Sequence, residues 1–385
     1  MRSSDERASH VSRQAHPWLV WALGLWVVFA AAVVIKTLVS PEQRTVFPKC
    51  AARAGSWWQG KPLYAQHEGL GRFPYSPTFA IALTPFWWLG NRFGAALWTL
   101  MMIGVYVGGL RRLARDVLPG DWPPQREAVL LLLAMLGAIR GFWNAQTNAL
   151  IIGLLMLAAS AIVRRRWWTA TALLAVPFYL KVWPVAISML CVVLWPRKLA
   201  GRFAVAMAIG AAIPFLTQMP AVVIEQYRGW WSYLSVMSMD LVRSYRDVWT
   251  VSRLLGASWN PTVYRVLQAA TGLAVLGWCL WQQRRAWSTQ WLLTWTLSLG
   301  AAWAMLFGPS IEYNTVVVLA PFGAWAVLLS LEQRQGRVLA GAAFVTATIL
   351  AAGAIERLWV DAVPAAVATL AVGSLLFAAW VILAA

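Results

Sequence analysis

Apolar runs of close to twenty residues follow one another along almost the whole chain. A helix needs roughly 20 such residues to cross the hydrocarbon core of a bilayer. Of the 385 residues, 60% are hydrophobic and only 12% are charged. No Ser/Gly-rich linker or charged low-complexity stretch divides the sequence, so we expect a single integral membrane domain over residues 1–385. The pattern predicts an all-α, polytopic transmembrane helical bundle.

The net charge of +18 is concentrated in short connections between apolar runs. Short basic loops are typical of the cytoplasmic side of a membrane protein and also attract anionic lipids. We therefore expect membrane lipids as partners and no nucleic acid. The basic loops are Arg164 to Arg166, Arg197 with Lys198 and Arg202, Arg284 with Arg285, and Arg334 with Arg337.

Placing these four loops in the cytoplasm fixes the direction of most spans. A cytoplasmic tail at 1–17 and two long external loops, at 40–75 and 220–261, follow. Compact domains rarely keep a long loop without a use for it, so we expect a multi-pass protein of the cell membrane whose functional face is external. The spans expected lie near 147–163, 167–180, 183–195, 203–219, 262–281, 288–307, 313–330, 337–353 and 363–383.

Residues 76–110 do not fit readily into this alternation of spans. They hold two apolar pieces split near Gly90, and two full crossings would place Arg111, Arg112 and Arg115 outside, against the charge rule. Either one piece is re-entrant or interfacial, or this loop breaks the rule. We expect about 11 to 13 spans.

Four polar side chains, Asn144, Gln146, Asn148 and Lys181, lie in otherwise apolar surroundings. Polar groups at bilayer depth are costly unless a hydrated cavity or a ligand satisfies them, so their clustering marks a candidate site. Hydrogen bonding between helices is the alternative for the three amides. A lysine next to Trp183 favours a functional interpretation.

The first external loop, residues 40–75, combines cations with aromatic side chains. Lysine and arginine bind phosphate oxygens, and flat aromatic faces stack on sugars, so this loop could seat a lipid phosphate and its sugar. An interfacial amphipathic helix with snorkelling cations is the alternative. The residues of this loop that we expect to bind substrate are Lys49, Arg53, Arg72, Tyr64 and Tyr75.

The three cysteines and three histidines are scattered, without the spacing of a metal site or a disulfide framework. The sequence has no D-x-D pair, glycine-rich phosphate loop, Walker motif or H-E-x-x-H. We therefore expect no metal and no cofactor.

The order of several short motifs resembles glycosyltransferase family 87, the mannosyltransferase-like membrane enzymes of the GT-C superfamily. Each motif is short, and their order and spacing over about residues 40 to 330 carry the resemblance. The matching positions are Gly60, Leu63 and Tyr64; Tyr75-Ser76-Pro77; Gln146-Thr147-Asn148; Lys181 with Pro184; and Gly308-Pro309.

This resemblance implies a GT-C-like fold, a polyprenyl-phosphate sugar as donor, and an extracytoplasmic active site near the first loop. A hexosyl (mannosyl-like) or pentosyl group would pass to an envelope lipid or glycan acceptor with inversion. Such a displacement needs a carboxylate base for the acceptor hydroxyl and cations for the departing phosphate. Among the cations, Lys181 is the foremost candidate for the second task.

The sequence departs from the family pattern where an aspartate is expected early in the first external loop. Residues 45–50 contain no acid, and the nearest carboxylates are Glu42 and Glu68. Glu312, just after Gly308-Pro309, is the candidate catalytic base, because a carboxylate beside a membrane-embedded turn is rarely idle; a solvated loop acid is the alternative. The missing aspartate also favours a second hypothesis, a non-catalytic translocator or binder of lipid-linked saccharides.

Overall fold

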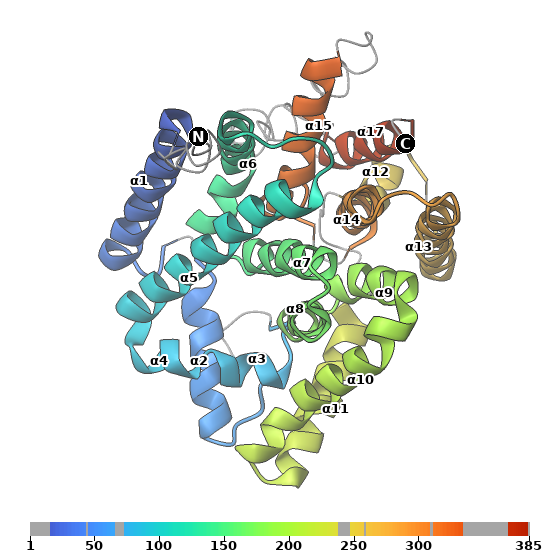
Figure 1. Ribbon diagram of the computed structural model, residues 1–385. Helices are drawn as coiled ribbons and strands as arrows, with labels where there is room; N and C mark the ends of the chain where they lie inside the picture. Colours follow the sequence, from blue (N-terminus) through green and yellow to red (C-terminus); the bar gives the residue numbers. More distant parts are fainter. Residues whose placement is uncertain are drawn as a thin grey trace, which may run out of the picture.

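The computed structural model is helical throughout the part of the chain that it describes, and no strand occurs there (Figure 1). The predicted all-α bundle is therefore confirmed. The described residues are 16–43, 45–65, 73–237, 247–257, 259–308, 311–333 and 369–383.

Four of the described helical stretches are long and apolar enough to cross a membrane. They are α1 (Pro17–Val39), α5 (Gly90–Arg112) with its π-helical extension Leu113–Val117, α10 (Pro196–Ala212) with the 3-10 turn Ile213–Leu216, and α13 (Pro261–Arg284). Shorter apolar helices are α7 (Asn148–Val163), α8 (Trp167–Leu180), α9 (Pro184–Leu194), α15 (Ala320–Gln333) and α17 (Thr369–Leu383). The remaining helices in the bundle are α6 (Pro124–Trp143) and α14 (Thr289–Phe307).

Helix α7 lies near the centre of the bundle, whereas α1 and α13 lie at opposite edges (Figure 1). Nearly every side chain of α7 is buried. Its closest approach is to α5, where a Cβ atom on Gly109 would lie 2.8 Å from the carbonyl oxygen of Gly153. Small residues let two helix backbones meet in this way, and the resulting van der Waals contact stabilises helix pairs in membranes.

Replacing Gly109 with leucine should therefore force α5 away from α7. Overpacking of this kind costs about 1–3 kcal/mol of unfolding free energy, so the thermal unfolding temperature of the purified protein, followed by circular dichroism in detergent, should fall. Gly108→Leu is the matched control, because a Cβ atom there meets nothing within 4 Å. Equal effects of the two substitutions would contradict the close-packing argument.

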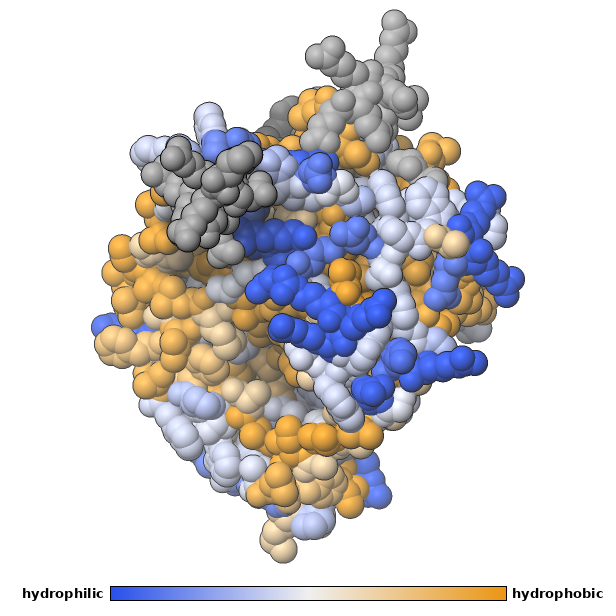
Figure 2. Space-filling view, in the orientation of Figure 1, coloured by the Kyte–Doolittle hydropathy of each residue, from blue (hydrophilic) through white to orange (hydrophobic). Residues whose placement is uncertain are grey.

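One end of the bundle, which we call the basic end, carries the arginine-rich connections. Buried Glu127 at the start of α6 accepts hydrogen bonds from Arg111 and Arg115, each at 2.8 Å. Asp116, just beyond α5, pairs with Arg164 at the end of α7 (2.8 Å). Figure 2 shows the hydrophilic side chains gathered over α7, α8, α10 and α13, with hydrophobic surface around them.

The opposite end, which we call the site end, holds both long loops. The first loop contains α2 (Phe47–Trp58), and the second contains α11 (Pro220–Met237) and α12 (Val248–Leu254). The loops touch each other, since the Leu63 amide donates to the Gln226 side chain (2.9 Å) and the Trp230 indole donates to the Pro74 carbonyl (3.2 Å).

The structure resolves the ambiguity in residues 76–110. The first apolar piece forms α3 (Pro77–Ala82) and α4 (Thr84–Trp88), which are too short to cross a bilayer. Only α5 runs from the site end to the basic end. Arg111 and its neighbours therefore lie at the basic end, and the charge rule is kept.

Two helical segments differ in extent or type from the predicted spans. Helix α10 begins at Pro196, not near 203, because proline suits the first helical position and the basic residues after it continue the helix. The span expected from 313 begins as a 3-10 turn, Tyr313–Val318, before α15. The span expected at 337–353 and most of the tail at 1–17 lie outside the described residues.

Candidate active site

Lys181 and Asn148 meet at the site end, although 33 residues separate them in sequence. Asn148 is the first residue of α7, and Lys181 directly follows α8. The ammonium group of Lys181 donates to Asn148 Oδ1 at 2.9 Å. Asn148 is only 2% exposed, so this amide holds the lysine from inside the bundle.

Thr315 connects this pair to Glu312. The Thr315 hydroxyl accepts from the Asn148 amide (3.4 Å) and from the backbone N–H of Glu312 (3.1 Å). Glu312 itself is exposed. Lys181, Asn148, Thr315 and Glu312 are thus joined by consecutive hydrogen bonds, and we call this series the polar chain. It begins at the Lys181 ammonium group and ends at the backbone N–H of Glu312.

Helix α2, in the first loop, lies beside the polar chain. Cys50 is buried in α2, beside Tyr75 and close to the charge of Lys181. Burial raises the pKa of the Cys50 thiol to about 12, although a hydrogen bond with Tyr75 and the charge of Lys181 oppose the rise. The thiol therefore stays protonated at neutral pH and does not act as a nucleophile.

Arg53 lies one helical turn further along α2 and is only 2% exposed. Its guanidinium lies 5.9 Å from the centre of the Phe73 ring. Burial lowers the pKa of Arg53, and the neighbouring Tyr233, Cys50 and Tyr64 oppose that shift. A snorkelling arginine would keep its charge in water, so that alternative does not hold for Arg53.

Tyrosines 64 and 75 close the loop around this cluster. The Tyr64 hydroxyl donates to the Tyr75 carbonyl at 2.8 Å. Helix α11 holds the same segment from outside, because Gln226 accepts from the Leu63 amide and donates to the Lys61 carbonyl at 3.3 Å. The second long loop therefore fixes the geometry of the first.

The pKa of Lys181 is lowered to about 8. Burial is the largest cause, and the negative charge of Glu312 opposes it. Near neutral pH the lysine is mainly protonated, and it loses its charge as the pH rises through about 8. The site thus holds an ammonium group whose charge has little solvent around it.

The structure brings most, but not all, of the predicted site residues together. Those in one cluster are Lys181, Asn148, Glu312, Arg53, Tyr64 and Tyr75. Lys49 is exposed on α2 near Cys50, and Arg72 lies outside the described residues.

Asn144 and Gln146 have backbone roles in the turn between α6 and α7. The backbone carbonyl of Asn144 accepts from the Val46 N–H (3.1 Å), and the backbone N–H of Gln146 donates to the Gly141 carbonyl (2.9 Å). Ala145 between them has a positive φ of 50°. This tight turn carries Asn148 to the position where it meets Lys181.

Thr315 and Cys50 were not predicted as site residues. The sequence did contain a signal for Thr315. It lies three positions after Glu312, and acidic and hydroxyl residues at this spacing often cap a helix start. Cys50 lies in the predicted first external loop, and nothing local in the sequence indicates its burial. Among the described residues, no group of three or more His, Cys, Asp or Glu side chains could hold a metal.

The cluster belongs to a membrane-embedded helical protein that places a buried cation near a carboxylate. A model of glycosyltransferase family 87 matches residues 73–309, which is more than half of the chain. The chain therefore belongs to glycosyltransferase family 87, and the resemblance seen in the motif order is confirmed. Lys181 and Asn148 lie within the matched residues, whereas α2 and Glu312 lie outside them.

Two crystal structures of ArnT from Cupriavidus metallidurans are similar to this chain. The apo structure has 15% sequence identity and a TM-score of 0.41, with 94% of this chain and 76% of that chain covered. The structure bound to undecaprenyl phosphate has 16% identity and a TM-score of 0.46, with 93% and 76% covered. No curated protein sequence matches this chain.

Proposed function

We propose that this membrane glycosyltransferase moves a hexosyl (mannosyl-like) or pentosyl group from a polyprenyl-phosphate sugar to an envelope lipid or glycan, with inversion. The polar chain Lys181–Asn148–Thr315–Glu312 is the observation that carries this proposal. Lys181 supplies a cation that can bind a phosphate, and the nearby Glu312, whose negative charge acts on Lys181, supplies a carboxylate that can take a proton; their proximity supports the proposal. The site end lies opposite the basic end, which supports an extracytoplasmic site.

The reaction is a single displacement at the anomeric carbon. The acceptor hydroxyl oxygen bonds to that carbon from one face, and Glu312 takes the hydroxyl proton as general base. The bond from the anomeric carbon to the phosphate oxygen breaks on the other face, and polyprenyl phosphate leaves with the bonding electrons. Lys181 and Arg53 stabilise the negative charge that develops on this phosphate.

The other predicted residues surround this centre. Tyr64 offers aromatic surface for the sugar, and buried Tyr75 supports it from beneath by accepting the hydrogen bond of its hydroxyl. Lys49 and Arg72 add positive charge to the first loop. Asn148 is a positioning residue in this scheme, because it holds the lysine ammonium. Gln146 and Asn144 shape the turn from which Asn148 projects.

A transfer assay with the purified chain tests the proposal directly. The protein is reconstituted in liposomes with polyprenyl-phosphate mannose, or with a pentosyl donor, and with envelope lipid and glycan fractions as acceptors. We expect a glycosylated acceptor and an equal amount of released polyprenyl phosphate. Donor binding without any transfer would instead support a translocator or binder of lipid-linked saccharides.

Donor affinity should depend on pH through Lys181. The ammonium form binds phosphate, so we expect the Kd for the donor to rise as the pH increases through about 8, the pKa of this lysine. Lys181→Arg should remove this rise, since arginine stays charged throughout the range. The measurement is equilibrium binding of the donor between pH 6.5 and 9.5. A rise of the same size in the arginine variant would contradict the assignment.

A further inference from the structure

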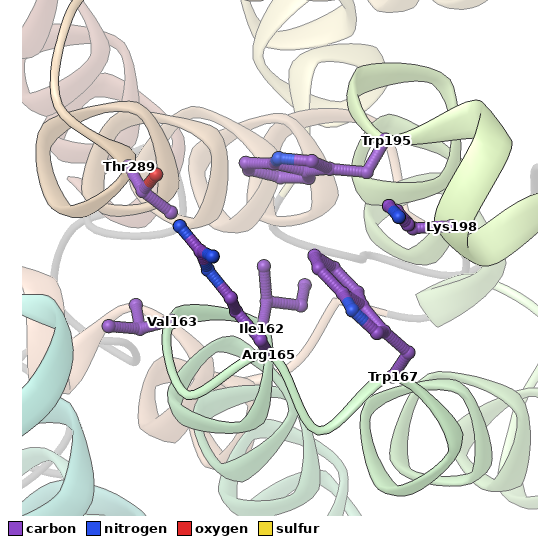
Figure 3. Close-up of a pocket in the computed structure, with 7 residues that line it drawn as sticks. All are labelled: Ile162, Val163, Arg165, Trp167, Trp195, Lys198 and Thr289. Carbon is purple, nitrogen blue, oxygen red and sulfur yellow. The ribbon is translucent and has the colours of Figure 1, made fainter.

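A cavity of about 440 Å³ opens at the basic end, far from the polar chain that holds Lys181. It lies between the α7–α8 connection, the start of α10 and the start of α14 (Figure 3). The lining side chains that matter are Ile162, Arg165, Trp167, Trp195, Lys198 and Thr289. Its volume falls within the range of roughly 300–1,000 Å³ that is usual for small-molecule sites.

Two cations line this cavity without a carboxylate. Arg165 extends towards Thr289 on one side, and Lys198 lies on the other side (Figure 3). Within the described part of the chain, neither forms an ion pair. The nearby Asp116 is already held by Arg164 at 2.8 Å. The cavity thus keeps two positive charges for a ligand.

The backbone adds to this positive potential. Helix α8 begins at Trp167, α10 at Pro196 and α14 at Thr289, so three helix N-termini converge on the cavity. None of the three helices has an acidic residue in its first turn. Helix N-termini carry partial positive charge and favour anions over cations. Cationic side chains near these helix N-termini are therefore repelled when no ligand is present, and a bound anion would offset that repulsion.

The aromatic lining indicates what kind of anion fits. Trp167 and Trp195 are half-buried, and their indole rings project into the cavity (Figure 3). Indole rings favour the membrane–water interface, because each ring has an apolar surface and a polar N–H group. Ile162 adds an apolar wall. A free inorganic anion would use the charges but not this apolar surface, whereas a lipid headgroup with its glycerol backbone uses both.

From this geometry we propose that the cavity binds the phosphate headgroup of an anionic phospholipid from the leaflet at the basic end. Arg165 and Lys198 bind the phosphate oxygens, and the two indoles contact the glycerol and the first acyl carbons. Basic pockets between membrane helices are suited to such headgroups. The bound lipid would tie α7, α8, α10 and α14 together at the end opposite the candidate active site, independently of the proposed transfer reaction.

The first test uses the full chain in a neutral detergent with dioctanoyl phosphatidylglycerol as the probe. Binding is measured by native mass spectrometry, and thermal unfolding is followed in parallel. We expect saturable binding and a higher unfolding temperature. Dioctanoyl phosphatidylcholine should bind at least about tenfold more weakly, because its headgroup has no net negative charge to match the two cations. Equal binding of the two lipids would overturn the proposal.

A second arm separates a lipid from a soluble phosphate ester. Glycerol 3-phosphate carries the same phosphate and glycerol groups but no acyl chains. We expect it to displace the phosphatidylglycerol only at concentrations far above those of the lipid. Displacement at equal concentrations would show that a soluble phosphate ester is the ligand and would overturn the assignment to a lipid.

Paired variants locate the site. Arg165→Gln with Lys198→Gln should weaken phosphatidylglycerol binding by at least about tenfold, since two charge-assisted contacts are lost. Arg166→Gln with Arg197→Gln is the matched control, because it removes the same charge from neighbouring positions that do not line the cavity. All four side chains are exposed, so the fold should tolerate both changes. Equal weakening of phosphatidylglycerol binding by the two double variants would show that the lipid is attracted to the basic end in general. That result would overturn the proposed site.

Discussion

The Lys181→Met variant should lose about a thousandfold in kcat/KM for transfer from a polyprenyl-phosphate sugar. Removing one group that stabilises charge in a transition state commonly costs about 10²- to 10³-fold in rate, and here the donor also loses a phosphate contact. Methionine keeps the length and apolar stem of the side chain, so the packing between α8 and α9 is preserved. The loss therefore reports on the charge and not on a cavity.

Lys61→Met is the control for this experiment. Lys61 is an exposed lysine of the same loop region at the site end. Its hydrogen bonds are made by the backbone, whose N–H donates to the Ser56 carbonyl and whose carbonyl accepts from Gln226. We expect its transfer rate to stay within about twofold of the wild type, because exposed surface changes usually have small effects. Radiolabelled donor and thin-layer separation of products give both rates. A Lys181→Met variant that transfers as fast as the Lys61 variant would refute the role of Lys181.

The arrangement of the two ends could be predicted from the sequence, because it depends on charge and span length alone. Basic connections alternate with apolar runs, so parity places Asn148 and Lys181 at the same end. Their hydrogen bond at 2.9 Å agrees with that placement. The short length of α3 and α4 was one of two alternatives left open, and only the helix breaks before Thr84 and Gly90 decide it.

The interior of the site could not be predicted in the same way. Arg53 lies on a helix whose sequence suits a membrane surface, yet it is buried because α11, more than 160 residues later, closes over the first loop. Thr315 joins Asn148 to Glu312 only because a 3-10 turn packs against the start of α7. Contacts of this kind arise from tertiary packing and leave no periodic signal in the chain.

The first external loop lacks the acid that the resemblance to the family led us to expect. Residues 45–50 carry no acid, so a base must come from elsewhere if transfer occurs. Glu42 is the nearest carboxylate in sequence, whereas Glu312 is joined through Thr315 and Asn148 to Lys181. Proximity in space matters for proton transfer, and proximity in sequence does not.

Glu312→Gln should accordingly lower kcat by about 10²- to 10⁴-fold, the range expected when a general base is removed, while donor binding is retained. Glutamine keeps the shape of the side chain and the backbone contacts of the turn, so the loss should appear in kcat more than in KM. Single-turnover transfer and equilibrium donor binding measure the two quantities separately. Glu42→Gln, at an exposed position before α2, serves as the comparison. A reversal, in which Glu42→Gln is inactive and Glu312→Gln is active, would place the base in the first loop. If both variants and the wild type bind the donor without transferring it, the chain handles lipid-linked saccharides without the chemistry of its family.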